Sequence, residues 1–189
     1  MTMFGDKRSR RIVIVSHCIL NQNAKLEGIA SWRGLIEPVV EVLWKSGVGI
    51  IQMPCPEMLY EGIRRFDKSV EQYSCPAFRK LCERIAEDVV DQVEDYLDNG
   101  YKVLAILAID GSPSCGYNLT QSAPEWRGLV AGRNLKKVRY IKGRGVFMEI
   151  LEKKLSEKGI QIPFLGIPEI PELGSMEEAI AKFRLLLES

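Results

Sequence analysis

The sequence predicts an α/β protein, a three-layer α/β/α sandwich built on a mainly parallel, Rossmann-like sheet. Short apolar runs typical of strands alternate along the chain with longer stretches of helical periodicity. One of these runs, residues 103–109, is apolar throughout, as expected of a central strand covered on both faces. Strands joined by helices pair in parallel through right-handed crossovers, so helices should cover both faces of the sheet.

The first strand is expected over residues 11–17. A polar loop at 21–25 leads to a helix over about 34–45, in which Pro38 fits only the first helical turn. The Ser-Gly step at 46–47 ends this helix.

The second strand follows over residues 48–54, and a longer helix comes after it. This helix should begin at Ser74 as N-cap, carry Pro76 in its first turn, and stop at the Asn-Gly step 99–100. Its apolar residues recur every four positions and predict one buried stripe, formed by Leu81, Ile85, Val89, Val93 and Leu97.

The last third of the chain begins with residues 116–143, which show no clean period. We expect a long loop or a small insertion over the site. A helix over 145–158, a strand over 162–167 and a helix over 175–187, with Ser175 as N-cap, complete the fold. The helix over 145–158 has an apolar side, formed by Phe147, Ile150, Leu151 and Leu155.

The 189 residues are expected to form one domain, with residues 1–10 as a flexible tail. A composition of 46% hydrophobic and 27% charged residues is that of a soluble globular protein. A net charge of +1 creates no overall electrostatic attraction for polyanions. Nucleic acid and membranes are therefore not expected partners. Because no apolar run reaches the roughly 18 residues of a membrane span and no signal peptide is evident, we expect a cytoplasmic protein.

Three of the five cysteines follow predicted strands: Cys18 the first, Cys55 the second, and Cys115 the third. If these strands are parallel neighbours, the sulfurs emerge at the carboxyl edge of the sheet, where open α/β sheets bind ligands. Three converging thiolates can hold a metal ion or an iron–sulfur cluster and leave one position open. An odd number of cysteines in a cytoplasmic protein argues against a disulfide framework, although isolated cysteines also serve as packing residues.

Two turns next to these cysteines are rich in chemical groups. Residues 110–116, Asp-Gly-Ser-Pro-Ser-Cys-Gly, place the hydroxyls of Ser112 and Ser114 beside a thiol and present amide groups to a ligand. In the segment 53–57, Met-Pro-Cys-Pro-Glu, the prolines keep the cysteine extended. Glu57 should point into the same space, where it can move a proton.

Four further residues have roles that the sequence leaves open. His17, the only histidine, can act as an acid or base or can cap the strand. Cys75 and Cys82 lie seven residues apart near one helix and favour a packing role, although a position near the helix N-terminus lowers the pKa of a thiol. Glu169 follows the fourth strand in a Pro-Glu step like that at 56–57.

The motifs resemble those of the DUF523 family, whose characterised branch is the 2-thiouracil desulfurases. The matching elements span most of residues 11–158. They are Cys-Ile-Leu at 18–20, Cys-Pro-Glu at 55–57, Ser-Pro-Ser-Cys-Gly at 112–116 and Gly-Arg-Gly-Val-Phe at 143–147.

The resemblance implies a single DUF523-like domain and an oxygen-sensitive desulfurase acting on a small thiolated molecule. It implies a [4Fe–4S] cluster whose fourth iron is free to take sulfur. The cluster would be bound by Cys18, Cys55 and Cys115. Protons and substrate would be handled by Glu57 and a serine, either Ser112 or Ser114.

Two segments depart from the family pattern and leave the substrate open. Residues 25–28 are Lys-Leu-Glu-Gly where the family has Arg-Tyr-Asp-Gly, and 58–65 replace a Gly-Gly-x-Pro-x-Pro-Arg segment. Two other functions stay open on the residues alone. One is a cofactor-free cysteine hydrolase with Cys115 as nucleophile and His17 as base. The other is a non-enzymatic metal- or cluster-binding or sulfur-carrying module.

Overall fold

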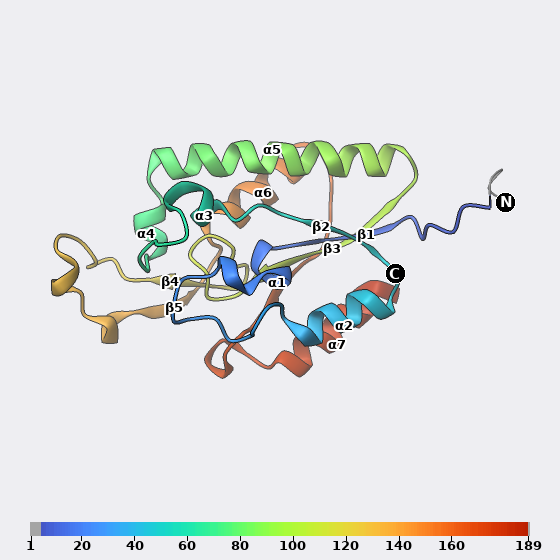
Figure 1. Cartoon of the computed structure of the whole chain (residues 1–189). Helices are drawn as coiled ribbons and strands as arrows, with labels where there is room; N and C mark the ends of the chain where they lie inside the picture. Colours follow the sequence, from blue (N-terminus) through green and yellow to red (C-terminus); the bar gives the residue numbers. More distant parts are fainter. Residues whose placement is uncertain (1–4, 189) are drawn as a thin grey trace.

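A four-stranded parallel sheet with the order β2-β1-β3-β6 forms the centre of the protein (Figure 1). The computed structural model describes residues 5–188, except for the side chains of residues 132 and 135. The strands are β1 (Arg11–Val15), β2 (Gly49–Gln52), β3 (Lys102–Ile109) and β6 (Phe164–Ile167). The four predicted strands are thus confirmed, and the three that precede the cysteines are neighbours.

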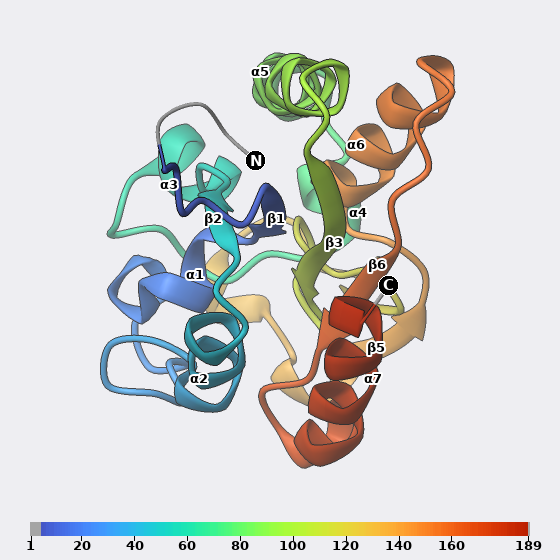
Figure 2. The same cartoon turned by 90° about the vertical axis from the view of Figure 1, so that its right-hand side faces the viewer.

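Helices cover both faces of this sheet, which confirms the predicted three-layer α/β/α sandwich. Figure 2, which looks along the layers, shows one pair of helices on each side of the strands. One pair consists of α5 (Pro76–Asp98) and α6 (Val146–Glu157), and the other of α2 (Glu37–Lys45) and α7 (Met176–Glu188).

The core is divided by the sheet into two apolar clusters, one under each pair of helices. Strand β3 contributes to both, with Ile106 and Ala108 on one side and Leu107 and Ile109 on the other. Because its side chains alternate between two buried faces, this strand carries apolar residues at every position from 103 to 109.

Helix α5 differs in two details from the prediction. Its N-cap is Cys75 rather than Ser74. The prediction of the buried stripe is wrong at the C-terminal end of the helix, where Leu97 is 37% exposed. The buried face is instead wider than a four-residue repeat and includes Phe78 and Cys82, because α5 packs against α6 as well as the sheet.

Residues 116–143, expected to form a long loop or a small insertion, form an insertion that contains regular structure. They contain an antiparallel hairpin, β4 (Leu119–Ser122) with β5 (Arg139–Lys142), and the short turns η2 (Val130–Gly132) and η3 (Leu135–Lys137). The sequence conceals the hairpin because the buried side chains of β4 are polar and those of β5 are exposed, so neither strand shows an apolar alternation.

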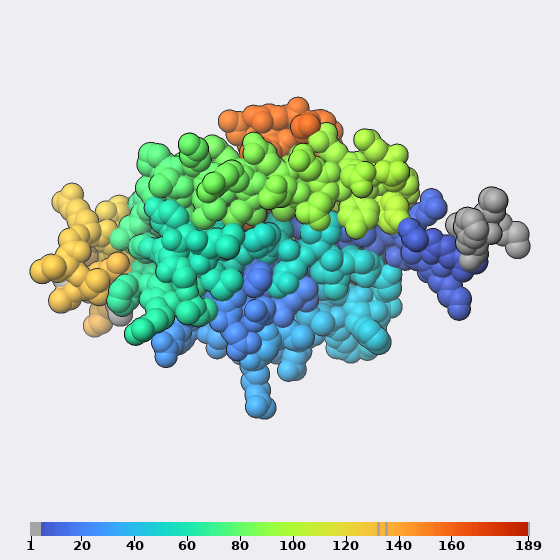
Figure 3. Space-filling model, turned by 45° about the horizontal axis from the view of Figure 1, so that its top comes forward, coloured from blue at the N-terminus to red at the C-terminus, as the bar shows by residue number. Residues whose placement is uncertain are grey.

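Short helical segments lie in the connections. They are α1 (His17–Leu20), η1 (Gln22–Ala24), α3 (Pro56–Glu61), α4 (Val70–Tyr73) and η4 (Pro171–Leu173). The segment 123–138, which joins β4 to β5, is called the hairpin arm below. Figure 3 shows it projecting at one end of the molecule and the N-terminal segment at the other.

Of the expected tail 1–10, residues 1–4 lie outside the described residues, and 5–10 are exposed without helix or strand. No helix in the described part of the chain combines the length and apolar character needed to cross a bilayer.

Candidate functional site

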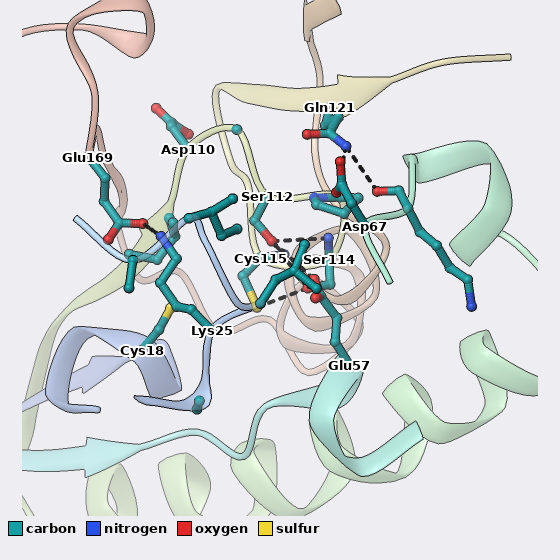
Figure 4. Close-up of a pocket in the computed structure, with 18 of the residues that line it drawn as sticks. Cys18, Lys25, Glu57, Asp67, Asp110, Ser112, Ser114, Cys115, Gln121 and Glu169 are labelled. Atoms are coloured by element: carbon teal, nitrogen blue, oxygen red, sulfur yellow. Dashed lines mark hydrogen bonds and ion pairs between the residues drawn. The ribbon is translucent and has the colours of Figure 1, made fainter. Parts of the chain in front are cut away.

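The three strand-end cysteines line one cavity of about 410 Å³. Cys18 lies in α1 directly after β1, Cys55 lies between β2 and α3, and Cys115 lies in the turn after β3. Since β1 is flanked by β2 and β3 in a parallel sheet, all three reach its carboxyl edge. Figure 4 shows Cys18 and Cys115 among the polar side chains that line the cavity.

The turn that carries Cys115 is held by the carboxylate of Asp110. This group accepts hydrogen bonds from the backbone N–H groups of Tyr117 at 3.1 Å and Asn118 at 2.8 Å, and from the Asn118 side chain at 2.9 Å. Asp110 is 5% exposed, and these donors satisfy it. Its role is therefore to fix the turn.

The N-terminus of α6 closes on the same turn. The N–H of Val146 donates to the carbonyl of Pro113 at 3.0 Å, and that of Phe147 to the carbonyl of Ser114 at 2.9 Å. Gly145 makes this approach possible, because a Cβ at this position would lie 2.4 Å from the carbonyl carbon of Ser114. The glycine-containing helix start therefore positions the cysteine turn.

Cys55 is the N-cap of α3. Its backbone is extended, with φ −78° and ψ 111°, as the flanking prolines predict, and its Sγ accepts a hydrogen bond from the Met58 N–H at 3.5 Å. Burial raises the pKa of this thiol, and the negative charge of Glu57 raises it further. The helix start therefore directs both the thiol and the Glu57 carboxylate to the cavity.

Glu57 contacts the serines of the cysteine turn. Ser114 Oγ donates to Glu57 Oε1 at 2.6 Å and lies 3.5 Å from Cys115 Sγ. Ser112 Oγ lies 3.2 Å from Ser114 Oγ and accepts from the Cys115 N–H at 3.0 Å. A carboxylate, two hydroxyls and a thiol thus form one continuous hydrogen-bonded group.

Arg65 is a site residue that the sequence does not single out. Its Nε donates to Glu57 Oε2 at 3.2 Å, and its Nη2 donates to the carbonyl of Ala24 at 2.8 Å. The Arg65 side chain is 3% exposed. It holds one carboxylate oxygen of Glu57, which leaves the other for the serines. Two arginines stand side by side at 64–65, and no local pattern says which one is buried.

Glu169, whose role the sequence left open, also lines the cavity. It forms an ion pair with Lys25 at 2.5 Å, and these side chains are only 4% and 12% exposed. Gln22 Nε2 bridges Glu169 Oε1 and the carbonyl of Cys18, both at 2.9 Å. The pair therefore connects the C-terminal end of β6 to the loop that follows the first cysteine.

The three thiols influence one another electrostatically. Burial is the main cause that raises the pKa of Cys18 and of Cys115, and the charges of neighbouring thiols add to it. Bringing three thiolates into this space therefore requires positive charge, which a bound metal centre supplies because it deprotonates its thiol ligands.

The donor set consists of three thiols that line one cavity. Within residues 5–188, no three His, Cys, Asp or Glu side chains gather closely enough to hold one metal ion. In a zinc site the sulfurs lie within about 4 Å of one another, because each Zn–S bond is about 2.3 Å. A [4Fe–4S] cluster spreads its thiolates over separate irons. Three sulfurs around a common cavity suit that arrangement.

Three of the cysteine and histidine candidates lie elsewhere. The residues that line the cavity do not include His17, Cys75 or Cys82 in the described structure. His17 accepts a hydrogen bond from Gln52 Nε2 through its backbone carbonyl at 2.8 Å, and Cys82 is fully buried in the core. A hydrolase with Cys115 as nucleophile and His17 as base would need that histidine to reach the cavity, which His17 does not line.

Comparisons with known proteins place the chain in a family. No family model matches it. It is 32% identical over 162 residues to the uncharacterized protein MJ0003 of Methanocaldococcus jannaschii, and the match covers 86% of this chain and 88% of that protein. A solved structure described as the [4Fe-4S]-dependent thiouracil desulfidase TudS (DUF523Vcz) is similar at a TM-score of 0.49 and 22% identity, over 86% of this chain and 95% of the other. The chain therefore belongs to the same family as MJ0003.

Proposed function

We propose that the protein is an iron–sulfur enzyme that removes sulfur from a small thiolated compound such as a 2-thiouracil. Cys18, Cys55 and Cys115 would hold a [4Fe–4S] cluster. The observation that carries this proposal is that three thiols share one cavity with a hydrogen-bonded Glu57–Ser114 pair. When bound, such a cluster supplies an open iron that accepts sulfur.

The other residues would supply water and proton chemistry. When a thiocarbonyl becomes a carbonyl, the carbon–sulfur bond breaks and the oxygen of one water molecule takes the place of the sulfur. The two protons of that water combine with the released sulfur to give hydrogen sulfide. Glu57 would accept a proton from that water, and Ser114, whose hydroxyl lies 2.6 Å from Glu57 Oε1, would relay it. Arg65 positions Glu57 through the hydrogen bond to Oε2. These roles agree with those that the family resemblance implies for Glu57 and a serine.

The same polar group favours an enzyme over a module that only carries a cluster or sulfur. A module that only carries a cluster or sulfur needs residues that bind this cargo and a path by which it can leave. Here a buried arginine fixes the carboxylate of Glu57, and that carboxylate accepts a hydrogen bond from the Ser114 hydroxyl, which lies 3.5 Å from Cys115 Sγ. Such an oriented acid–base group has no purpose in storage, whereas proton transfer needs it.

The experiment is purification without oxygen, followed by a spectrum and by iron and acid-labile sulfide analysis. We expect a brown protein that absorbs broadly near 400 nm and holds about four irons and four sulfides per chain. Cys18→Ser, Cys55→Ser and Cys115→Ser should each lower the iron content. Cys75→Ser, outside the cavity, is the matched control. Sulfide release from 2-thiouracil then tests the reaction. A colourless protein without iron would contradict the proposal.

A further inference from the structure

Asp67 and Gln121 form a polar wall of the same cavity that neither the family motifs nor the proposed chemistry assigns. Asp67 lies in the loop between α3 and α4, and Gln121 lies on β4 of the hairpin. Figure 4 shows them on one side of the cysteine turn, with Cys18, Lys25 and Glu169 on the opposite side. A ligand held between these walls would touch both.

The amide of Gln121 has a fixed orientation. Its Nε2 donates to Asp67 Oδ1 at 2.9 Å and to the carbonyl of Lys68 at 3.3 Å, which uses both hydrogens of the amide. What Gln121 keeps for a ligand is its Oε1, an acceptor. Because Gln121 is only 9% exposed, its amide does not rotate freely in solvent and keeps this orientation.

The carboxylate of Asp67 also offers acceptors. It keeps lone pairs beyond the one that Gln121 uses. The Asp67 backbone is anchored as well, because Arg133 of the hairpin arm donates to its carbonyl. Burial and the negative charge of Glu57 raise the pKa of Asp67, and the hydrogen bond from Gln121 opposes that shift. A partly buried carboxylate near a second carboxylate is stabilised by N–H donors from a ligand.

We propose that Asp67 and Gln121 form a specificity subsite that accepts hydrogen bonds from ring N–H groups of the substrate. The substrate class is then the cyclic thioamides that keep a free ring N–H. This inference rests on the proposed function, since it concerns the same cavity. A ring with alkylated nitrogens would leave buried acceptors without donors, and sites built to hydrogen-bond a ligand reject analogues that lack the group.

The test uses two sulfur-free probes, uracil and 1,3-dimethyluracil, titrated calorimetrically into the protein as isolated without oxygen. Uracil carries ring N–H groups and dimethyluracil has none. We expect uracil to bind at least about tenfold more tightly. Asp67→Asn keeps one side-chain oxygen for Gln121 but replaces the second oxygen with an NH2 group, which donates. In this variant the ratio of the uracil affinity to the dimethyluracil affinity should fall close to one. Asp91→Asn, the same change at an exposed position on α5, should keep the wild-type ratio.

Equal binding of both probes by the wild type, or no binding of uracil, would overturn the subsite. So would an unchanged ratio in Asp67→Asn. Because the readout is a ratio within each protein, a small loss of folded protein does not change it. The probes contain no sulfur, so the result is independent of turnover. A protein that prefers uracil but holds no iron would contradict the proposed cluster chemistry alone.

Discussion

The Ser114 hydroxyl donates a 2.6 Å hydrogen bond to Glu57 Oε1, joining residues 57 positions apart in the chain. Glu57 stands in the first turn of α3, after the edge strand β2, and Ser114 stands in the turn after β3. Strand β1 lies between these two strands, so the bond crosses the carboxyl edge above it. It places a carboxylate–hydroxyl pair beside Cys115, whose Sγ lies 3.5 Å from the same hydroxyl.

Glu57→Gln should abolish most activity without loss of the cluster. Glutamine keeps the size of the side chain and can still accept from Ser114, but it cannot take up a proton. We expect turnover of 2-thiouracil to fall about 100-fold or more, because a general acid–base group contributes at least that factor. Iron content, measured on the same preparation, should match the wild type. Glu83→Gln, at an exposed position on α5, is the control. A Glu57→Gln protein with normal turnover would remove Glu57 from the mechanism.

Arg65 should act as a positioning residue for Glu57. Arg65→Lys keeps the charge but cannot reach Glu57 and the Ala24 carbonyl at once as the planar guanidinium does. We expect kcat to fall at least tenfold while KM and iron content stay near wild type. The neighbouring exposed residue supplies the control, Arg64→Lys, which should have wild-type kcat. If kcat and stability fell together in Arg65→Lys, with iron lost in proportion, the role of Arg65 would be structural only.

The sequence predicts the sheet well because strands and long helices leave strong local signals. The unbroken apolar run of β3 and the caps of α7 are examples, and Ser175 Oγ accepts from the Glu178 N–H at 3.3 Å as an N-cap should. The cavity is less predictable. Lys25, Arg65 and Gln121 enter it from three separate segments, and a charged or polar residue that will be buried looks like any surface residue in the sequence.

Cys75 should be the first thiol to react with iodoacetamide in cluster-free protein. It caps the N-terminus of α5, where the N–H of Phe78 and the Tyr60 hydroxyl lower the pKa of its thiol. Burial raises the pKa of Cys18, Cys55 and Cys115 instead. A lowered pKa keeps thiolate present at lower pH, so one fast equivalent should appear at a pH below that at which an ordinary thiol ionises, and the cavity thiols should follow only as the pH rises.

Mass spectrometry of the alkylated peptides, sampled over time at several pH values, measures this order. Cys75→Ser should remove the fast phase and leave the slow ones. It should also leave iron binding unchanged, since Cys75 does not line the cavity in the described structure. A fast phase that maps to Cys115 would instead indicate an activated nucleophile and would favour the hydrolase alternative.

Gly145→Ala should damage the site through the backbone. The added Cβ would lie 2.4 Å from the Ser114 carbonyl carbon and 2.9 Å from the Cys115 nitrogen, and backbone atoms cannot turn aside as a flexible side chain can. Either α6 or the cysteine turn must move, which displaces Cys115 and breaks the hydrogen bonds from the helix start. We expect iron content to fall by at least half and the melting temperature to drop by several degrees, since overpacking costs about 1–3 kcal/mol.

The matched control is Gly34→Ala, where a Cβ meets nothing within 4 Å and which should behave as wild type. Normal iron binding in Gly145→Ala would mean that the turn tolerates displacement and that the close approach of α6 does not position Cys115.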